Sequence, residues 1–93
     1  MQTYVIFRRG AWLSQEDLDA ATAVASRIAE DEMSGQLNWI RSYVLSEEDG
    51  TLGTVCVYEA DDEDVIMEHA QRAEIPADEV MLVEDTVIMR DDP

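Results

Sequence analysis

The segment LNWIRSYVLSEEDGTLGTVCVYE, residues 37–59, decides the fold because it holds two strand signals joined by a turn signal. Residues 37–45 and 54–59 are rich in β-branched and aromatic side chains, which favour strands. The pair Asp49-Gly50 lies in the polar stretch between them and is typical of a hairpin turn. The segment therefore predicts an antiparallel hairpin.

A helix is predicted on each side of this hairpin. The first begins after the N-cap Ser14 and ends before Gly35. Its apolar residues recur every three or four positions and are Leu18, Ala21, Ala25 and Ile28. The second helix is predicted over about residues 63–73, after a cap at Asp61 or Asp62.

Two further strands complete the pattern. Residues 3–9 (TYVIFRR) form the first strand signal and residues 80–90 the last. The order strand, helix, strand, strand, helix, strand predicts an α+β fold of the ferredoxin-like split βαβ type, βαββαβ, with a four-stranded antiparallel sheet and both helices on one face. We expect one domain over residues 1–90 and a frayed acidic tail at residues 91–93.

Alternation along the strands sorts their side chains into two sets, one for each face of the sheet. We expect the smaller, branched set to pack under the helices: Val5, Phe7, Ile40, Val44, Val55, Val57, Val83 and Val87. The opposite set bears aromatic rings and arginines and contains Tyr4, Ile6, Arg8, Trp39, Arg41, Tyr43, Leu45, Cys56, Tyr58, Leu82, Glu84 and Ile88. Because aromatic residues and arginine are enriched in interfaces, this second face predicts a homodimer with face-to-face sheets, as in dimeric α/β-barrels. An open face with scattered aromatic residues is the alternative.

The charge of the chain is its most unusual global feature. It has 22 acidic residues against 6 basic ones, and its net charge is -16. Such a charge repels nucleic acid and anionic membranes, so neither is expected as a partner. High salt screens this self-repulsion, which suggests a salt-rich, halophilic cytosol; an ordinary acidic protein from a genome that favours arginine codons is the alternative.

Export and covalent cross-linking are not indicated. No apolar run approaches the roughly 18 residues of a membrane span, and no signal-peptide pattern opens the sequence. Cys56 is the only cysteine, which excludes an intrachain disulfide and zinc sites built from cysteine pairs. We therefore expect a cytoplasmic protein in which Cys56 is an inert small hydrophobe.

His69 is the only histidine and the first residue to consider for chemistry. On the second helix it shares a stripe with apolar residues and points toward the sheet. This placement fits a core histidine that makes one hydrogen bond. It also fits a metal ligand, with Glu59 or Glu68 completing a site of nitrogen and oxygen atoms.

A second group of candidate residues lies around Arg41 on the predicted aromatic face of the sheet. This group, which is suited to an anionic or aromatic small molecule or to dimer packing, consists of Trp39, Arg41, Tyr43, Tyr58 and Glu84. No Gly-rich phosphate loop or dinucleotide fingerprint is present, so no nucleotide cofactor is expected. No catalytic residue is assigned.

Three segments resemble a known family: WIRSYV (39–44), CVYEA (56–60) and EHAQRAEIPAD (68–78). The chain is similar to small ferredoxin-like domains of unknown function often labelled nickel-binding proteins. The resemblance implies a homodimer and a divalent metal site, with nickel as the metal. In this family a histidine can occupy the position held here by Arg41. In this chain His69 is therefore the one imidazole left to bind the metal that the resemblance implies.

Three classes of function stay open at this point. The leading one is a small cytoplasmic binding protein, for a divalent metal such as nickel or for a small ligand. The second is an enzyme of the dimeric α/β-barrel kind, such as a monooxygenase, for which no acid, base or nucleophile outside His69 stands out by its spacing. The third is a structural or interaction module.

Overall fold

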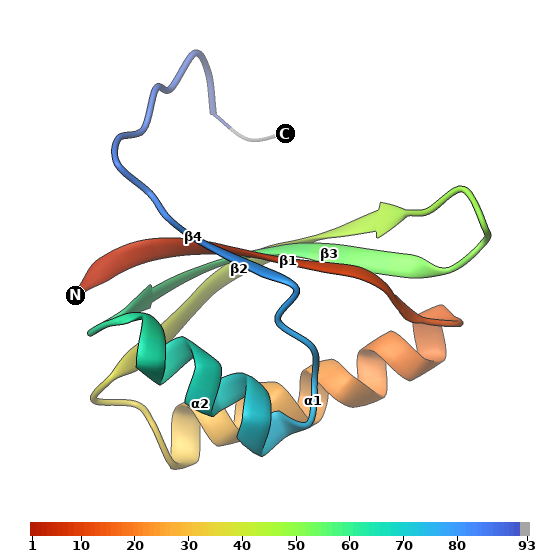
Figure 1. Cartoon of the computed structure of the whole chain (residues 1–93), viewed down its shortest axis with the longest axis horizontal. Coiled ribbons are helices and arrows are strands. Elements are labelled where there is room, and N and C mark those ends of the chain that lie inside the picture. Colours follow the sequence, from red (N-terminus) through yellow and green to blue (C-terminus); the bar gives the residue numbers. More distant parts are fainter. Residues whose placement is uncertain (92–93) are drawn as a thin grey trace.

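The computed structural model describes residues 1–91 and shows the predicted α+β order of elements. These elements are β1 (Gln2–Trp12), α1 (Gln15–Asp31), β2 (Leu37–Ser46), β3 (Leu52–Ala60), α2 (Glu63–Ala73) and β4 (Glu79–Leu82). The sheet has the order β2-β3-β1-β4 and all its neighbours are antiparallel. Both helices lie on one side of the sheet, and the segment after β4 lies on the other (Figure 1). The ferredoxin-like prediction is confirmed.

Both helices begin where their capping residues predict. The side chain of Ser14 accepts a hydrogen bond from the backbone N–H of Asp17 at 3.2 Å. Asp62 accepts one from the N–H of Val65 at 3.0 Å. Each cap pairs a backbone donor that the first turn leaves free. Within the part of the chain that is described, no helix is long and apolar enough to cross a membrane.

The assignment of the two faces of the sheet is corrected by the structure. The face beneath the helices carries the aromatic and arginine-bearing set of β1 and β3, and its buried members are Tyr4, Ile6, Arg8, Cys56 and Tyr58. The branched residues predicted there lie half-buried on the other face: Val5, Phe7, Val55 and Val57. Alternation defines the two sets but does not say which one the helices cover. Here the larger side chains fill the space under the helices, and the charged tip of Arg8 is met there by the carbonyl of Pro76.

A β-bulge at Ile40 changes the facing of β2. Trp39 pairs with Tyr58 in the ladder while Arg41 pairs with the next residue, Val57, so Ile40 is an extra residue. Trp39 therefore faces the helices, whereas Arg41 and its neighbour Tyr43 lie on the other side. The prediction that these three side chains share one face is wrong because simple alternation does not include the bulge. Ile40, predicted in the core, is 46% exposed.

The last strand is shorter than predicted. It covers Glu79–Leu82 instead of residues 80–90, and the N–H of Val83 makes one more hydrogen bond to Thr3 at 2.9 Å before the chain leaves the sheet. We call residues 83–91 the C-terminal segment. It carries the exposed residues Val87, Ile88 and Met89, and also Glu84. Of the predicted frayed tail, residues 92–93 lie outside the described residues.

The sheet face away from the helices is called the open face below. Its side chains on β1, β2 and β3 include Thr3, Val5, Phe7, Arg41, Tyr43, Val55, Val57 and Glu59. The C-terminal segment borders this face and encloses a shallow hollow together with Val5, Arg41 and Val57.

Candidate functional site

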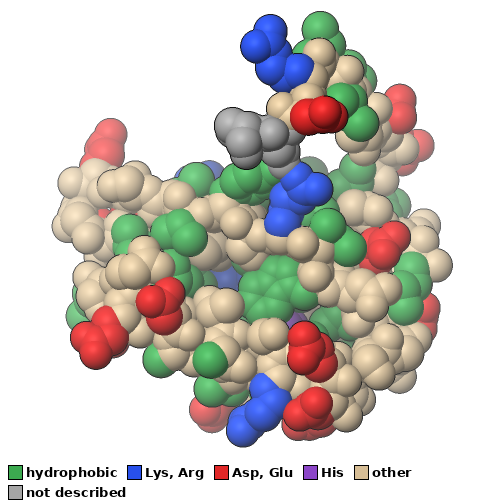
Figure 2. All heavy atoms as spheres, turned by 180° about the vertical axis from the view of Figure 1, so that it is seen from behind, with side chains coloured by type: hydrophobic (Ala, Val, Ile, Leu, Met, Phe, Trp, Pro, Cys, Tyr) green, Lys and Arg blue, Asp and Glu red, His purple; other side chains and the backbone are tan. Residues whose placement is uncertain are grey.

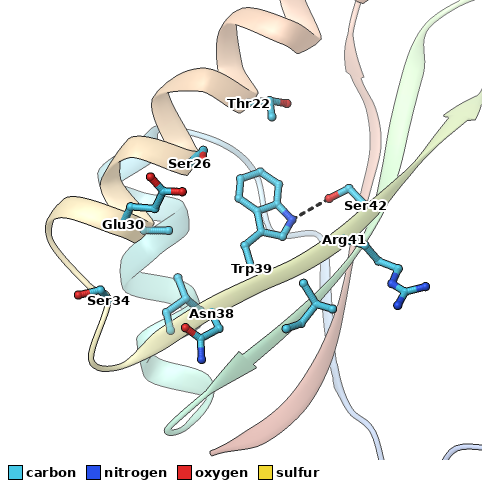
Figure 3. Close-up of a pocket in the computed structure, with 11 residues that line it drawn as sticks. Thr22, Ser26, Glu30, Ser34, Asn38, Trp39, Arg41 and Ser42 are labelled. Carbon is cyan, nitrogen blue, oxygen red and sulfur yellow. Dashed lines mark hydrogen bonds between the residues drawn. The ribbon is translucent and has the colours of Figure 1, made fainter.

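A groove of about 450 Å³, here called the outer groove, opens between α1 and the edge strand β2. Thr22, Ser26 and Glu30 line it from α1, and Trp39 and Ser42 line it from β2 (Figure 3). The indole of Trp39 points from the strand toward the helix, while the side chain of Arg41 points away. Seen from behind, on the β2 side, hydrophobic side chains gather near the middle and acidic ones lie mostly around the rim (Figure 2).

A second cavity, here called the inner pocket, has a volume of about 240 Å³ and shares three residues with the outer groove: Thr22, Trp39 and Ser42. Trp12 also lines it, so both tryptophans of the chain border the inner pocket. The ring of Trp39 stacks on that of Tyr58, with centroids 5.2 Å apart and planes at 17°. Trp39 therefore stands where the outer groove meets the inner pocket.

The polar wall of the inner pocket is joined by hydrogen bonds. Trp39 Nε1 donates to Ser42 Oγ at 2.8 Å, and Ser42 Oγ donates to Cys56 Sγ at 2.9 Å. Arg8 Nη1 donates to the same sulfur at 3.2 Å. The thiol of Cys56 lies 3.5 Å from Thr54 Oγ1. The Cys56 sulfur thus receives two donors although sulfur is a weak acceptor.

Arg8 is buried without a carboxylate. It is 1% exposed, its Nε donates to the carbonyl of Pro76 at 2.6 Å, and its Cζ lies 5.9 Å from the centre of the Tyr58 ring. Among residues 1–91 no ion pair joins it to an acidic side chain. A buried charge is costly unless it is paired, and the contacts of this guanidinium are all with neutral groups.

His69 lies next to this cluster and is 0% exposed. Its Nε2 is 2.9 Å from the carbonyl oxygen of Ala25, so Nε2 carries the proton and donates. Burial lowers the pKa of His69, the hydrogen bond to Ala25 opposes this shift, and the positive charge of Arg8 adds to it. Burial also raises the pKa of Tyr58, and the nearby charge of Arg8 opposes that rise.

Three buried polar atoms of this region have no hydrogen-bond partner in the described part of the chain: Arg8 Nη2, Tyr58 OH and His69 Nδ1. Most buried polar atoms in proteins do have such a partner. The rings of Tyr58 and His69 are 5.6 Å apart, which places two of the three atoms in one neighbourhood. Unsatisfied polar groups that gather in this way mark the region as a candidate binding site.

The structure separates the residues that sequence reasoning grouped around Arg41. Trp39 and Tyr58 meet in the interior beside His69. Arg41 and Tyr43 lie on the open face, where Arg41 Nη1 is 3.5 Å from Tyr43 OH. Glu84 lies in the C-terminal segment, beyond β4.

The residues that sequence reasoning missed are Arg8, Ser42 and Thr54. The sequence does contain one indication of Arg8: with Tyr4 and Ile6 it occupies every second position of the first strand, so all three share one face. An arginine that continues an apolar stripe is a candidate for a buried charge.

The three predicted metal ligands are not brought together. His69 points into the interior, Glu59 projects from β3 on the open-face side, and Glu68 lies exposed on α2 in an ion pair with Arg72. No group of three or more metal-ligating side chains occurs within residues 1–91. The only nitrogen of His69 that is left for a metal shares its surroundings with the cation Arg8. These residues do not fit a nickel ion.

Comparison with known proteins gives a family and a fold. The family model described as "Nickel responsive protein SCO4226-like" matches residues 4–83. The crystal structure of SCO4226 from Streptomyces coelicolor A3(2) superimposes with a TM-score of 0.71 at 16% identity, over 91% of this chain and 99% of that chain. At this identity the likeness shows the fold alone. No curated protein matches the sequence.

Proposed function

This chain belongs to the SCO4226-like family of nickel-responsive proteins, and we propose that it is a binding protein whose small organic ligand occupies the inner pocket. The observation that carries the proposal is the pocket itself. Apolar side chains form most of its wall, and the polar groups of Arg8, Ser42, Thr54 and Cys56 converge on one side. Ligand sites in proteins have this composition.

The outer groove supports the proposal because it offers a path from solvent. The groove and the inner pocket share Thr22, Trp39 and Ser42, and Figure 3 shows the indole of Trp39 bonded to Ser42 on the groove side. Thr22 and Ser42 are exposed, so the inner pocket is open to solvent at residues that it shares with the groove. A ligand can therefore reach the pocket without separation of α1 from the sheet.

The test fills the pocket from α1. Ala21 lines the inner pocket, whereas Ala23 is exposed on the same helix and lines neither cavity. Ala21→Phe and Ala23→Phe therefore add the same volume in two places. Tryptophan fluorescence reads out binding of small organic molecules because both tryptophans border the pocket. We expect Ala21→Phe to weaken binding at least tenfold and Ala23→Phe to bind like the parent. Equal binding by all three folded proteins would refute the site.

A monooxygenase-like enzyme of the dimeric α/β-barrel kind is the alternative. It would convert the bound molecule, whereas a binding protein returns it unchanged. Incubation of the protein with a bound ligand in air, followed by chromatography of the extract, distinguishes an enzyme from a binding protein. We expect complete recovery of the ligand; a protein-dependent product that disappears with Ala21→Phe would favour the enzyme.

Nickel is the ligand that the family description suggests, and it needs a separate test. Because His69 is buried beside Arg8 and apart from Glu59 and Glu68, we expect it to contribute nothing to nickel binding. Titration with Ni²⁺ should give the same weak binding for the parent and for His69→Gln. A tight site in the parent that His69→Gln abolishes would restore the metal function predicted from the sequence.

We also propose that the protein is a homodimer that pairs its open faces. The open face is supported as an interface by its half-buried branched residues and by Tyr43, which is 45% exposed. Val57→Glu would add a like charge to the centre of this face in each copy, whereas Val24→Glu adds one on exposed α1. Analytical ultracentrifugation at high salt should find a dimer for the parent and Val24→Glu and a monomer for Val57→Glu. A monomeric parent at tens of micromolar would exclude this pairing.

A further inference from the structure

We infer that the ligand of the inner pocket is a small monocarboxylate whose head group binds the guanidinium of Arg8. The inference rests on the proposed function and names the ligand class. It follows from the charge, the donors and the size of the pocket.

The charge of Arg8 requires an anionic partner that the described chain does not supply. Its Nε contacts a neutral carbonyl, its Nη1 contacts a sulfur, and its Nη2 has no hydrogen-bond partner among residues 1–91. Arginine stays protonated in proteins, and its planar fork matches the two oxygens of a carboxylate. A carboxylate would therefore replace a weak acceptor by a strong one and neutralise a buried charge.

The neighbouring hydroxyl groups suit the same head group. Ser42 Oγ now donates to Cys56 Sγ, so a carboxylate oxygen in the pocket would offer this hydroxyl a better acceptor. Thr54 is 3% exposed and lines the pocket beside Cys56. Arg8 with these two hydroxyls gives donors on one wall, and donors are what a carboxylate needs.

The rest of the pocket suits an apolar, ring-sized body. Its other walls are mainly hydrophobic and include Trp12, Leu18, Ala21, Ala25, Trp39, Val44 and Ile75. A cavity of about 150 Å³ accepts benzene. The inner pocket, at about 240 Å³, therefore has room for one ring and a carboxylate.

Electrostatic repulsion disfavours ligands that carry more than one negative charge. Asp19 also lines the inner pocket, where Gln15 donates a hydrogen bond to it at 2.9 Å, and the whole chain carries a net charge of -16. A polyanion or a phosphate ester would be repelled more strongly than a monocarboxylate. The structure therefore favours molecules such as benzoate and phenylacetate over phosphorylated ones.

The experiment compares benzoate with its neutral isostere benzamide at constant ionic strength, with tryptophan fluorescence as the readout. We expect the parent to bind benzoate at least tenfold more tightly than benzamide. Arg8→Met should remove this preference, and Arg8→Lys, which keeps the charge but loses the fork, should reduce it. Circular dichroism checks the fold of each variant. If Arg8→Met does not fold, the preference for benzoate over benzamide is still compared between the parent and Arg8→Lys.

The outcomes separate this inference from the proposed function. If benzamide binds as tightly as benzoate and Ala21→Phe weakens both, the pocket binds ligands but the carboxylate inference is wrong. If neither compound binds, the carboxylate inference is overturned, and the proposed function is decided separately by the comparison of Ala21→Phe with Ala23→Phe. A benzoate preference that Ala21→Phe and Arg8→Lys leave unchanged would place the anion elsewhere and also overturn the inference.

Discussion

Replacement of His69 by glutamine should change the pH dependence of stability in a defined direction. Burial lowers the pKa of His69 in the folded chain below the ordinary value of 6.5. As the pH falls below 6.5, the unfolded chain takes up the proton first, so the contribution of neutral His69 is complete above this pH and declines below it. The decline is at most about 1.4 kcal/mol per pH unit.

The assay is urea unfolding of the parent and of His69→Gln at constant high salt, at several pH values between 5 and 7.5. The many surface carboxylates titrate alike in both proteins, so the parent's free energy of unfolding minus that of the variant isolates His69. The lost packing of the imidazole adds only a constant offset. Burial raises the pKa of Tyr58 above its ordinary value, which already lies above this pH range, so Tyr58 adds no slope. A difference that is flat between pH 5 and 6.5 would refute the buried neutral imidazole.

Three further changes test the fold. A Cβ on Gly53 would lie 2.6 Å from the carbonyl oxygen of Arg8, whereas one on Gly35 meets nothing within 4 Å. Gly53→Ala should therefore lower the free energy of unfolding by about 1–3 kcal/mol, and Gly35→Ala should change it by less than about 0.5 kcal/mol. Ser14→Ala removes the cap of α1 and should cost about 1 kcal/mol in urea unfolding. The melting temperature should rise with the concentration of potassium chloride because salt screens the repulsion that the net charge of -16 causes. A melting temperature that does not change with salt would exclude stabilisation by this screening.

The order of the elements could be predicted from the sequence because its signals are local. Ser14 and Asp62 cap the helices by contacts within three residues, and Asp49-Gly50 marks the hairpin turn between β2 and β3. The last strand was overestimated. The alternating pattern of the sequence continues past Leu82. Among the described residues, however, the chain there pairs with β1 only through the hydrogen bond from Val83 to Thr3.

The candidate site could be predicted only in part because it depends on which face the helices cover. Strand alternation correctly grouped Arg8 with Cys56 and Tyr58, but it could not say that this group is buried. The bulge at Ile40 then separated Trp39 from Arg41. The sequence therefore predicts a ligand-binding or dimer face around Arg41, whereas the arginine of the inner pocket is Arg8. The importance of Arg8 is visible only in the structure, where no carboxylate among residues 1–91 pairs with it.

Nuclear magnetic resonance of the labelled protein during titration with benzoate tests the inner pocket most directly. We expect shifts of the indole N–H signals of Trp12 and Trp39 and of the Nε–H signal of Arg8, all of which belong to residues that line the inner pocket. Saturating shifts at these three signals would support the pocket. No shift at all, or shifts confined to open-face residues such as Val5 and Val57, would contradict it.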